Sequence, residues 1–111
     1  MVGSQAGLRP DREGDGVLRI PWLSVEFVKV PITTGPPELT DLPVHMAILP
    51  KGQDPSPGDW KPAAWIGIRA SVLIGPGTGL PLEKGLTYGI WVRVTSAPEM
   101  PVLGPFPLHI T

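Results

Sequence analysis

The stretch that decides the fold of this chain is residues 85–95, Gly85-Leu86-Thr87-Tyr88-Gly89-Ile90-Trp91-Val92-Arg93-Val94-Thr95. Its large apolar residues fall on every second position, and this period of two places one apolar row on one face of an extended chain. The row consists of Leu86, Tyr88, Ile90, Val92 and Val94. The pattern predicts the best-defined β-strand of the sequence.

Tyr88 stands near the start of this strand, directly after the turn 82–85. In immunoglobulin-like (Ig-like) sandwiches a tyrosine near the start of the penultimate strand packs its ring and bonds its hydroxyl back to the preceding loop. Tyr88 therefore makes residues 85–95 a candidate penultimate strand. The alternative is an ordinary strand with a half-buried tyrosine, because the cysteine that accompanies this corner in antibody domains is missing.

Length and charge limit the function classes. The chain has 111 residues, enough for about one domain with a single core. Its net charge is −1, so no broad field attracts nucleic acid or an anionic membrane. It contains no cysteine, which excludes disulfides, thiolate nucleophiles and cysteine metal sites. Neither a signal peptide nor an apolar run of about 18 residues is present, so we expect a protein made in the cytoplasm with no membrane partner.

Glycine and proline punctuate the chain, with 14 and 16 residues respectively. The apolar residues, 41% of the chain, fall into discrete alternating runs between them. No window of about twelve residues free of both types has a convincing helical period. The chain is therefore predicted to be all-β, with turns at the Pro- and Gly-rich segments.

Four further strand regions are predicted, namely 24–30, 42–48, 65–74 and 106–110. Ser24–Val30 is expected to be the first strand of the domain, and its apolar residues fall on both faces, so both faces are expected to be partly covered. Prolines bound this strand and interrupt 106–110, which indicates edge strands or, for the last, a strand paired on one side only. Gly67 within 65–74 indicates a bulge or a close approach.

An Ig-like sandwich has about seven strands, so one or two short strands are expected within the loops 33–41, 50–62 or 76–83. The predicted fold is an all-β, Ig-like antiparallel β-sandwich over residues 17–111. Its predicted buried core comprises Val44, Met46, Ile48, Ile68, Val72, Tyr88, Ile90, Val92 and Leu108.

A flexible N-terminal arm, residues 1–16, is expected to precede the domain. It holds four glycines, five charges and few large apolar groups, so it cannot compensate the entropy lost on ordering. The arm is either a disordered tail or a segment that orders only against a neighbouring subunit.

Trp60 ends the polar loop that begins at Pro50, and Trp65 follows it after Lys61-Pro62-Ala63-Ala64. They either cap the sandwich core, which we favour, or expose an apolar patch for a partner or a sugar. Asp54 and Asp59 in this loop offer fewer oxygens than the six or so of a calcium site, so turn formation is expected of them.

A glycine-rich segment, Gly75-Pro76-Gly77-Thr78-Gly79-Leu80-Pro81, breaks the chain sharply. It lacks the Gly-Lys-Ser/Thr ending of a phosphate-binding loop, so a connection between strands is predicted. The candidate partner-binding residues are Trp60 and Trp65, if their rings are exposed, together with Gly75, Pro76, Gly77 and Thr78.

No constellation for catalysis is visible. The two histidines are isolated, and there is no His-Glu-x-x-His, no Gly-x-Ser-x-Gly and no plausible carboxylate pair. His45 falls opposite the apolar row of its strand, where a solvated or hydrogen-bonded side chain is more common than a metal ligand or a base. The basic residues form no stripe interleaved with aromatic residues. We therefore expect no enzyme, no cofactor, no metal and no specific nucleic-acid partner.

Several segments between Phe27 and Thr111 together resemble one family. They are Val28-Lys29-Val30-Pro31, Asp54-Pro55, Gly58-Asp59-Trp60-Lys61, Ala64-Trp65, Leu73-Ile74-Gly75-Pro76-Gly77 and the stretch 85–95 with Pro98-Glu99. The pattern resembles small Ig-like virion structural proteins of tailed bacteriophages, especially actinobacteriophages, encoded among head and head-to-tail connector genes. The resemblance implies a structural role in the virion, with capsid, portal or connector, or tail subunits as partners, and with copies of the chain itself.

Two hypotheses from different classes follow. The first is a non-enzymatic assembly protein that binds other virion subunits through strand edges, loops and the arm. The alternative is a carbohydrate-binding or adhesion module, because the flat rings of Trp60, Trp65 and Trp91 would stack on sugars if they were exposed.

Overall fold

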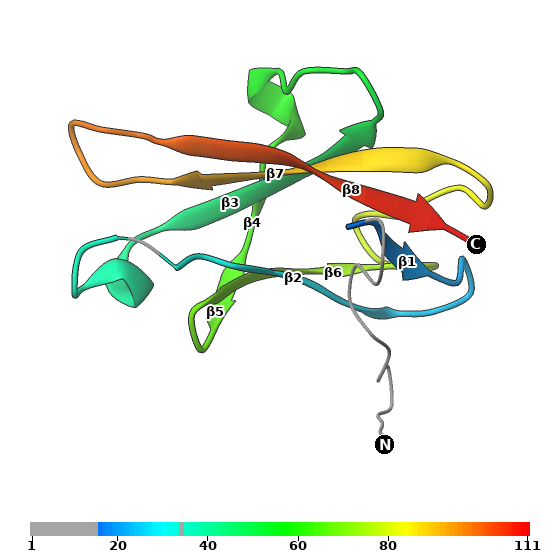
Figure 1. Cartoon of the computed structure of the whole chain (residues 1–111), viewed down its shortest axis with the longest axis horizontal. Helices are drawn as coiled ribbons and strands as arrows, with labels where there is room; N and C mark the ends of the chain where they lie inside the picture. Colours follow the sequence, from blue (N-terminus) through cyan, green and yellow to red (C-terminus); the bar gives the residue numbers. More distant parts are fainter. Residues whose placement is uncertain (1–15, 34) are drawn as a thin grey trace.

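The fold is all-β over the residues that the structure, a computed structural model, describes, 16–33 and 35–111 (Figure 1). The strands are β1 (Leu18–Ile20), β2 (Glu26–Pro31), β3 (Val44–Pro50), β4 (Lys61–Pro62), β5 (Ala64–Ile66), β6 (Arg69–Ile74), β7 (Thr87–Val94) and β8 (Val102–Ile110). Within these residues the helical elements are two short 3-10 helices, Leu39–Asp41 and Pro57–Asp59. None of the helices in this part of the chain is long and apolar enough to cross a membrane.

The strands form two sheets that pack face to face in a sandwich-like arrangement (Figure 1). The five-stranded sheet has the order β1-β8-β7-β3-β4, and the three-stranded sheet has the order β2-β6-β5. Every strand pair is antiparallel except β1 with β8, which is parallel, so the prediction of a purely antiparallel sandwich is wrong there. No hairpin joins β1 to β8, because the chain after β1 turns directly into β2 of the other sheet, and an antiparallel direction is therefore not imposed.

β7 lies in the middle of the five-stranded sheet, as its strict alternation suggests. It pairs with β3 on one side and with β8 on the other. Its inward residues Tyr88, Ile90, Val92 and Val94 are all buried, so it supplies one continuous wall of the core. β7 is the penultimate strand, as predicted.

Tyr88 makes the hydrogen bond that its position predicts. Its ring is buried, and its hydroxyl accepts the backbone N–H of Glu83 at 2.8 Å. Glu83 belongs to the loop that precedes β7. The bond fixes this loop to the strand that follows it, and it satisfies a phenol that would otherwise be costly to bury.

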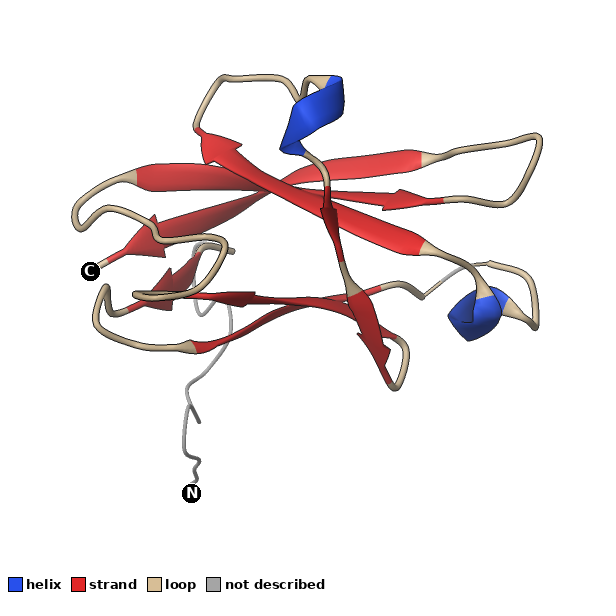
Figure 2. Ribbon diagram, turned by 180° about the vertical axis from the view of Figure 1, so that it is seen from behind, coloured by secondary structure: helices blue, strands red, loops and turns tan. Residues whose placement is uncertain are grey.

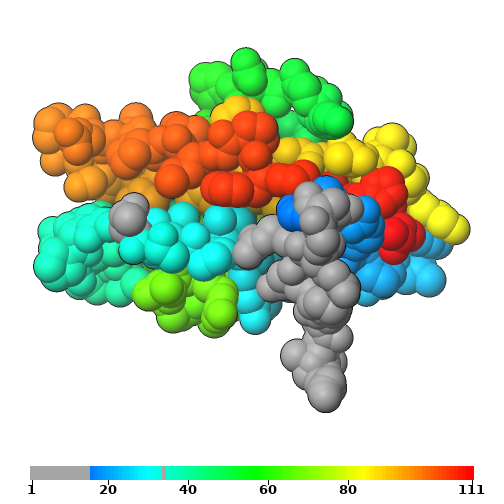
Figure 3. Space-filling view, in the orientation of Figure 1, coloured from blue at the N-terminus to red at the C-terminus, as the bar shows by residue number. Residues whose placement is uncertain are grey.

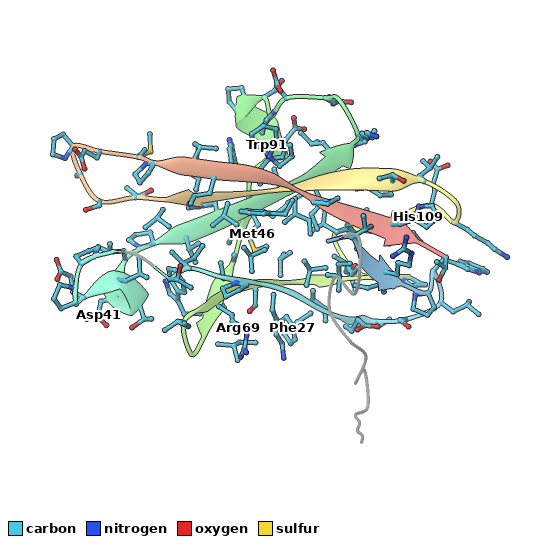
Figure 4. The ribbon with its side chains drawn as sticks, in the orientation of Figure 1. Phe27, Asp41, Met46, Arg69, Trp91 and His109 are labelled. Atoms are coloured by element: carbon cyan, nitrogen blue, oxygen red, sulfur yellow. The ribbon has the colours of Figure 1, made fainter. Side chains whose placement is uncertain are left out.

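The core lies between the two sheets, where Figure 4 places Met46. Apolar side chains of β1, β2, β3, β6, β7 and β8 form it, mostly valine, isoleucine and leucine, together with Met46, Ala70 and Tyr88. The residues predicted to be buried are buried, with the exception of Ile68. Ile68 is 53% exposed, so that prediction is wrong.

The region 65–74, predicted as one strand, is a hairpin. Gly67 and Ile68 form a two-residue turn between β5 and β6, and Ile66 pairs with Arg69. Gly67 has φ +62° and a Cβ there would touch nothing within 4 Å, so this glycine serves the turn and not a bulge or a close approach. Because the turn reverses the chain, Ile66 faces outward although Ala70 faces the core.

The predictions for the terminal strands are confirmed in part. β1 precedes β2, so Ser24–Val30 is not the first strand. β2 is an edge strand, as predicted; its inner face is buried, and Phe27 on its outer face is partly covered, at 46% exposed. β8 is nine residues long and lies between β1 and β7, although β1 covers only Leu108–Ile110. The proline-containing part of β8 is therefore paired on one side only, which is one of the two alternatives predicted for it.

One of the expected hidden strands is β4, within the loop 50–62. It pairs with β3, and the chain then crosses to β5 in the other sheet (Figure 2). The N–H of Ala63, at the crossing point, donates to the Val44 carbonyl at 3.0 Å. This crossover closes one side of the sandwich.

The segment between β3 and β4 stands on the outer side of the five-stranded sheet (Figure 3). Its 3-10 helix is closed by a capping box, in which the carboxylate of Asp59 accepts the N–H of Ser56 at 2.8 Å. Asp59 therefore forms a turn, as predicted. The predicted N-terminal arm lies outside the described residues, apart from Gly16.

Candidate functional site

A groove of about 510 Å³ opens beside β6, and we call it the β6 groove. Its lining comes from four segments that are distant in sequence. They are Phe27 of β2, the crossover Lys61–Ala64, the stretch Ser71–Leu73 of β6, and the loop 77–80. Its volume falls in the range of ordinary binding pockets, about 300–1,000 Å³.

The groove exists because β5 is shorter than β6. β6 pairs with β2 along all its residues, but β5 pairs only with Arg69–Ser71. Beyond Ser71 the place beside β6 is empty, because the chain before β5 leaves for the other sheet at Ala63 and Pro62. The incomplete edge and the crossover therefore form the bottom and one wall.

The loop 75–80 forms the opposite wall and is fixed by its own hydrogen bonds. The N–H of Gly75 donates to the Leu80 carbonyl at 3.1 Å. The Thr78 hydroxyl donates to the Gly75 carbonyl at 2.7 Å and accepts the N–H of Leu80 at 3.1 Å. The loop is thus a connection between strands, as predicted, and its wall is preorganised.

Gly75 is required by close contact with the turn before β2. It has φ +120°, and a Cβ there would lie 2.1 Å from the Ser24 carbonyl oxygen. Gly77 and Gly79, in contrast, have free space where a Cβ would stand. Packing holds one end of the loop, while its glycines leave the mouth of the groove open.

An apolar surface adjoins the groove on the outer face of the three-stranded sheet. Phe27 and Leu73 are directly opposite each other on β2 and β6, and they are 46% and 38% exposed. Val25 lies two residues before Phe27 and is 54% exposed. Figure 4 shows Phe27 and Arg69 on the side of this sheet that faces away from Met46. These apolar side chains are only partly covered by the described part of the chain.

The charge around the groove is positive. Lys61 is the one charged residue among those that line it. Lys29 and Arg69 occupy the same outer face of the sheet, because they alternate with the core residues of β2 and β6. No carboxylate lines the groove.

Trp65 packs against the core, which confirms the capping interpretation for this residue. Its indole N–H donates to the Leu42 carbonyl at 2.9 Å. Trp60 lies elsewhere, half-buried under the guanidinium of Arg93, which is 4.7 Å from the centre of the ring. Because Arg93 points outward from β7, Trp60 covers the outer face of the five-stranded sheet, and the capping prediction is wrong for it.

The outer face of the five-stranded sheet also holds three buried side-chain nitrogens without a hydrogen-bond partner in the described structure. They are His45 Nδ1, Trp91 Nε1 and Arg93 Nε. His45 pairs with Arg93 across β3 and β7, so two of them are neighbours. The indole of Trp91 lies beside Gly89 and Gly104, where a Cβ would come within 3.7 Å of Nε1 and 3.4 Å of Cε3 respectively. None of these three residues is among those that line the β6 groove.

Of the six candidate residues from the sequence, the structure brings Gly77 and Thr78 to the groove. Gly75 is buried behind them, Pro76 is exposed, and the two tryptophans do not line it. Phe27, Lys61 and Leu73 also line the groove, although none of them is among the candidates from the sequence. The signal for Phe27 was the second apolar row of its strand, which belongs to an exposed face.

No group of three or more histidine, cysteine, aspartate or glutamate side chains suited to a metal ion occurs among residues 16–33 and 35–111. The groove offers backbone groups, apolar side chains, a lysine and two hydroxyls, of Ser71 and Thr78, each of which already donates to a nearby backbone carbonyl. Such a surface is suited to binding by shape, backbone hydrogen bonds and one charge.

Comparison with protein-family models, with curated proteins and with solved structures gives no match for this chain.

Proposed function

We propose that the protein is a non-enzymatic structural subunit of a tailed-phage virion, which joins capsid, connector or tail subunits through the β6 groove and the adjoining sheet face. It is made in the host cytoplasm and incorporated into the particle, where copies of it contact one another. The resemblance of residues 27–111 to small Ig-like virion proteins motivates this assignment.

The strand order supports the Ig-like part of the proposal. In Ig domains one sheet contains strands C, F and G and the other contains B, E and D. β3-β7-β8 and β2-β6-β5 have the corresponding orders. The hydroxyl of Tyr88 on β7, the strand equivalent to F, bonds to the preceding loop as a tyrosine corner does.

The observation that carries the assembly role is the unfinished three-stranded sheet. Val25, Phe27 and Leu73 are exposed beside a groove with a free strand edge. Exposed apolar surface next to a sheet edge is typical of binding by a further chain. A repeated subunit needs such a surface to stay in place.

The alternative, carbohydrate binding, has less support. Trp65 is packed on the core, and one face of the Trp60 ring is occupied by Arg93. The two rings therefore do not form a common platform on which a sugar would stack. A neighbouring-gene map would favour this alternative if it placed the gene beside glycosidases instead of capsid and connector genes.

Mass spectrometry of purified virions tests the proposal directly. We expect the full-length protein at a fixed ratio to the major capsid or connector subunit after stringent washing. Its absence from virions whose other structural proteins are all detected would overturn the assembly role.

The arm is tested by deleting residues 1–16. The shortened chain is expected to fold with an unchanged core, because the described strands begin at Leu18. We expect it to incorporate poorly into particles. Normal incorporation would show that the arm is not an attachment device, and the groove would remain as the binding surface.

A further inference from the structure

We propose that the β6 groove binds an extended segment of a partner virion subunit by strand addition, and that this segment combines apolar side chains with carboxylates. The proposal rests on the assembly role only for the source of the segment. The groove's hydrogen-bonding groups, shape and charge determine the segment's chemistry.

The free backbone groups belong to Leu73. In an antiparallel sheet the N–H and C=O of successive residues point alternately to the two neighbouring strands. Ile68 uses its carbonyl on the β2 side, for the N–H of Ile32, and the N–H of Gly75 points the other way, to Leu80. The backbone N–H and C=O groups of the odd-numbered residues of β6 therefore point away from β2. Among these residues, Leu73 lies beyond the end of β5. A residue placed opposite Leu73 would receive both a donor and an acceptor.

The place beside Leu73 is kept open by the surrounding chain. The crossover at Ala63 is tied to Val44, and the loop 75–80 is closed by its own bonds. Ala64 and Leu80 occupy the same edge opposite Ser71 and beside Gly75, so the segment pairs with Leu73 alone, between two walls that are already ordered. Binding therefore avoids much of the ordering cost that a flexible edge would add.

Apolar residues in the incoming segment follow from what it would touch. Directly opposite residues in a sheet share a face, so the residue paired with Leu73 would lie beside the partly exposed Leu73 and Phe27. Its two neighbours would point inward, toward Val72 and Leu80. Both positions favour aliphatic side chains.

Carboxylates in the segment follow from the charge of the groove. Lys61 stands at its wall, Lys29 and Arg69 share the adjoining face, and no acidic residue lines it. An acidic segment would gain attraction and a basic one would be repelled, which gives selectivity as well as affinity. The net charge of −1 for the whole chain means that this preference is local.

The first experiment uses the full-length protein and a capped synthetic peptide of about seven alternating valine and glutamate residues. On binding we expect amide NMR shifts at Ser71, Leu73 and Gly79, and hydrogen exchange of the Leu73 amide slowed at least about tenfold. A peptide with lysine in place of glutamate should bind at least about fivefold more weakly. No shift at these amides, or equal binding of the two peptides, would overturn the proposal.

Matched variants locate the site. Gly79→Glu places a carboxylate in the groove without backbone strain. Its control, Gly58→Glu, places a carboxylate without backbone strain on the loop above the other sheet, away from the groove. Lys61→Glu reverses the charge at the wall, and Lys51→Glu is its control. We expect the first member of each pair to weaken peptide binding by about fivefold or more, and the second to change it less than about twofold. Equal effects within the pairs would place the peptide elsewhere.

A photo-reactive amino acid at position 79, in virions that contain the protein, identifies the natural occupant. A cross-link to an acidic and apolar segment of a different virion protein is the expected result. Cross-links to the arm, or to a second copy of this chain, would overturn the choice of occupant. The peptide experiment needs no particle, so its failure is distinguishable from absence of the protein from virions.

Discussion

The two outward faces of the sandwich differ in what covers them. On the five-stranded sheet, Ala47 and Leu49 of β3 are buried although they do not belong to the core between the sheets. Trp91 lies next to Ala47 on the neighbouring strand, and Trp60, the last residue of the segment that follows β3, lies against Arg93. This outward face is closed by the protein's own chain.

The three-stranded sheet has no such cover in the described residues. Its outward residues Phe27 and Leu73 are partly exposed, and the strand that would complete its edge is missing beyond Ser71. Within the described residues, the chain covers the outward face of the five-stranded sheet and leaves that of the three-stranded sheet partly exposed. The open face is therefore the surface on which we expect a partner.

The largest effect is expected inside the sandwich, between the two faces. Ile90→Ala should lower the free energy of unfolding by about 2–5 kcal/mol, because it removes buried methyl groups of β7 and leaves a cavity. Ile68→Ala, in the exposed hairpin turn, should cost less than about 0.5 kcal/mol. Urea unfolding of both variants measures the difference. A loss well under 1 kcal/mol for Ile90→Ala would contradict the assignment of the inward row.

The covered outward face should contribute next most. Trp91→Ala is expected to cost about 2 kcal/mol, less than the 3–5 kcal/mol or so of a fully buried tryptophan, because the ring is only partly buried. The stability of this variant and near-UV circular dichroism report the change. If the loss is no greater than that of a surface residue, the segment above the sheet does not hold this face closed.

The tyrosine bond gives a smaller effect. Tyr88→Phe keeps the ring but removes the acceptor of the Glu83 N–H, so we expect a loss of about 1 kcal/mol. Faster hydrogen exchange at the Glu83 amide should accompany it. An unchanged exchange rate would mean that this bond does not fix the loop before β7.

The smallest effect on stability is expected on the open face. Phe27→Ser should change the free energy of unfolding by less than about 1 kcal/mol, because nearly half of the side chain is already in water. The same change should reduce incorporation into virions, which quantitative mass spectrometry would measure. A loss of stability as large as that of Trp91→Ala would remove the contrast between the two outward faces.

Local patterns were enough to predict the class of the fold and much of its core. The alternation in residues 85–95 identified β7 and its buried row, and Tyr88 identified the bond to the preceding loop. The prolines of β2 and β8 indicated strands with an unpaired side. These signals are readable because an extended chain repeats its two faces at a period of two and proline removes one donor.

Alternation failed where the chain reversed direction. A period of two assigns one face only as long as the chain stays extended. At Gly67-Ile68 the two-residue turn places Ile66 beside Arg69 on the outer face, so the even-numbered positions change sides. Ile68 was therefore assigned to a core that it does not reach.

The sequence by itself determined that the chain is all-β, where most strands lie and which row of β7 is buried, because each of these depends on neighbours along the chain. Only the tertiary structure decided which outward face is covered, and it alone formed the β6 groove. Phe27, Lys61, Leu73 and Thr78 come from four segments that meet only when β5 ends short of β6 and the crossover leaves for the other sheet. A groove of this kind depends on the packing of segments distant in sequence, and residue spacing along the chain carries no record of that packing.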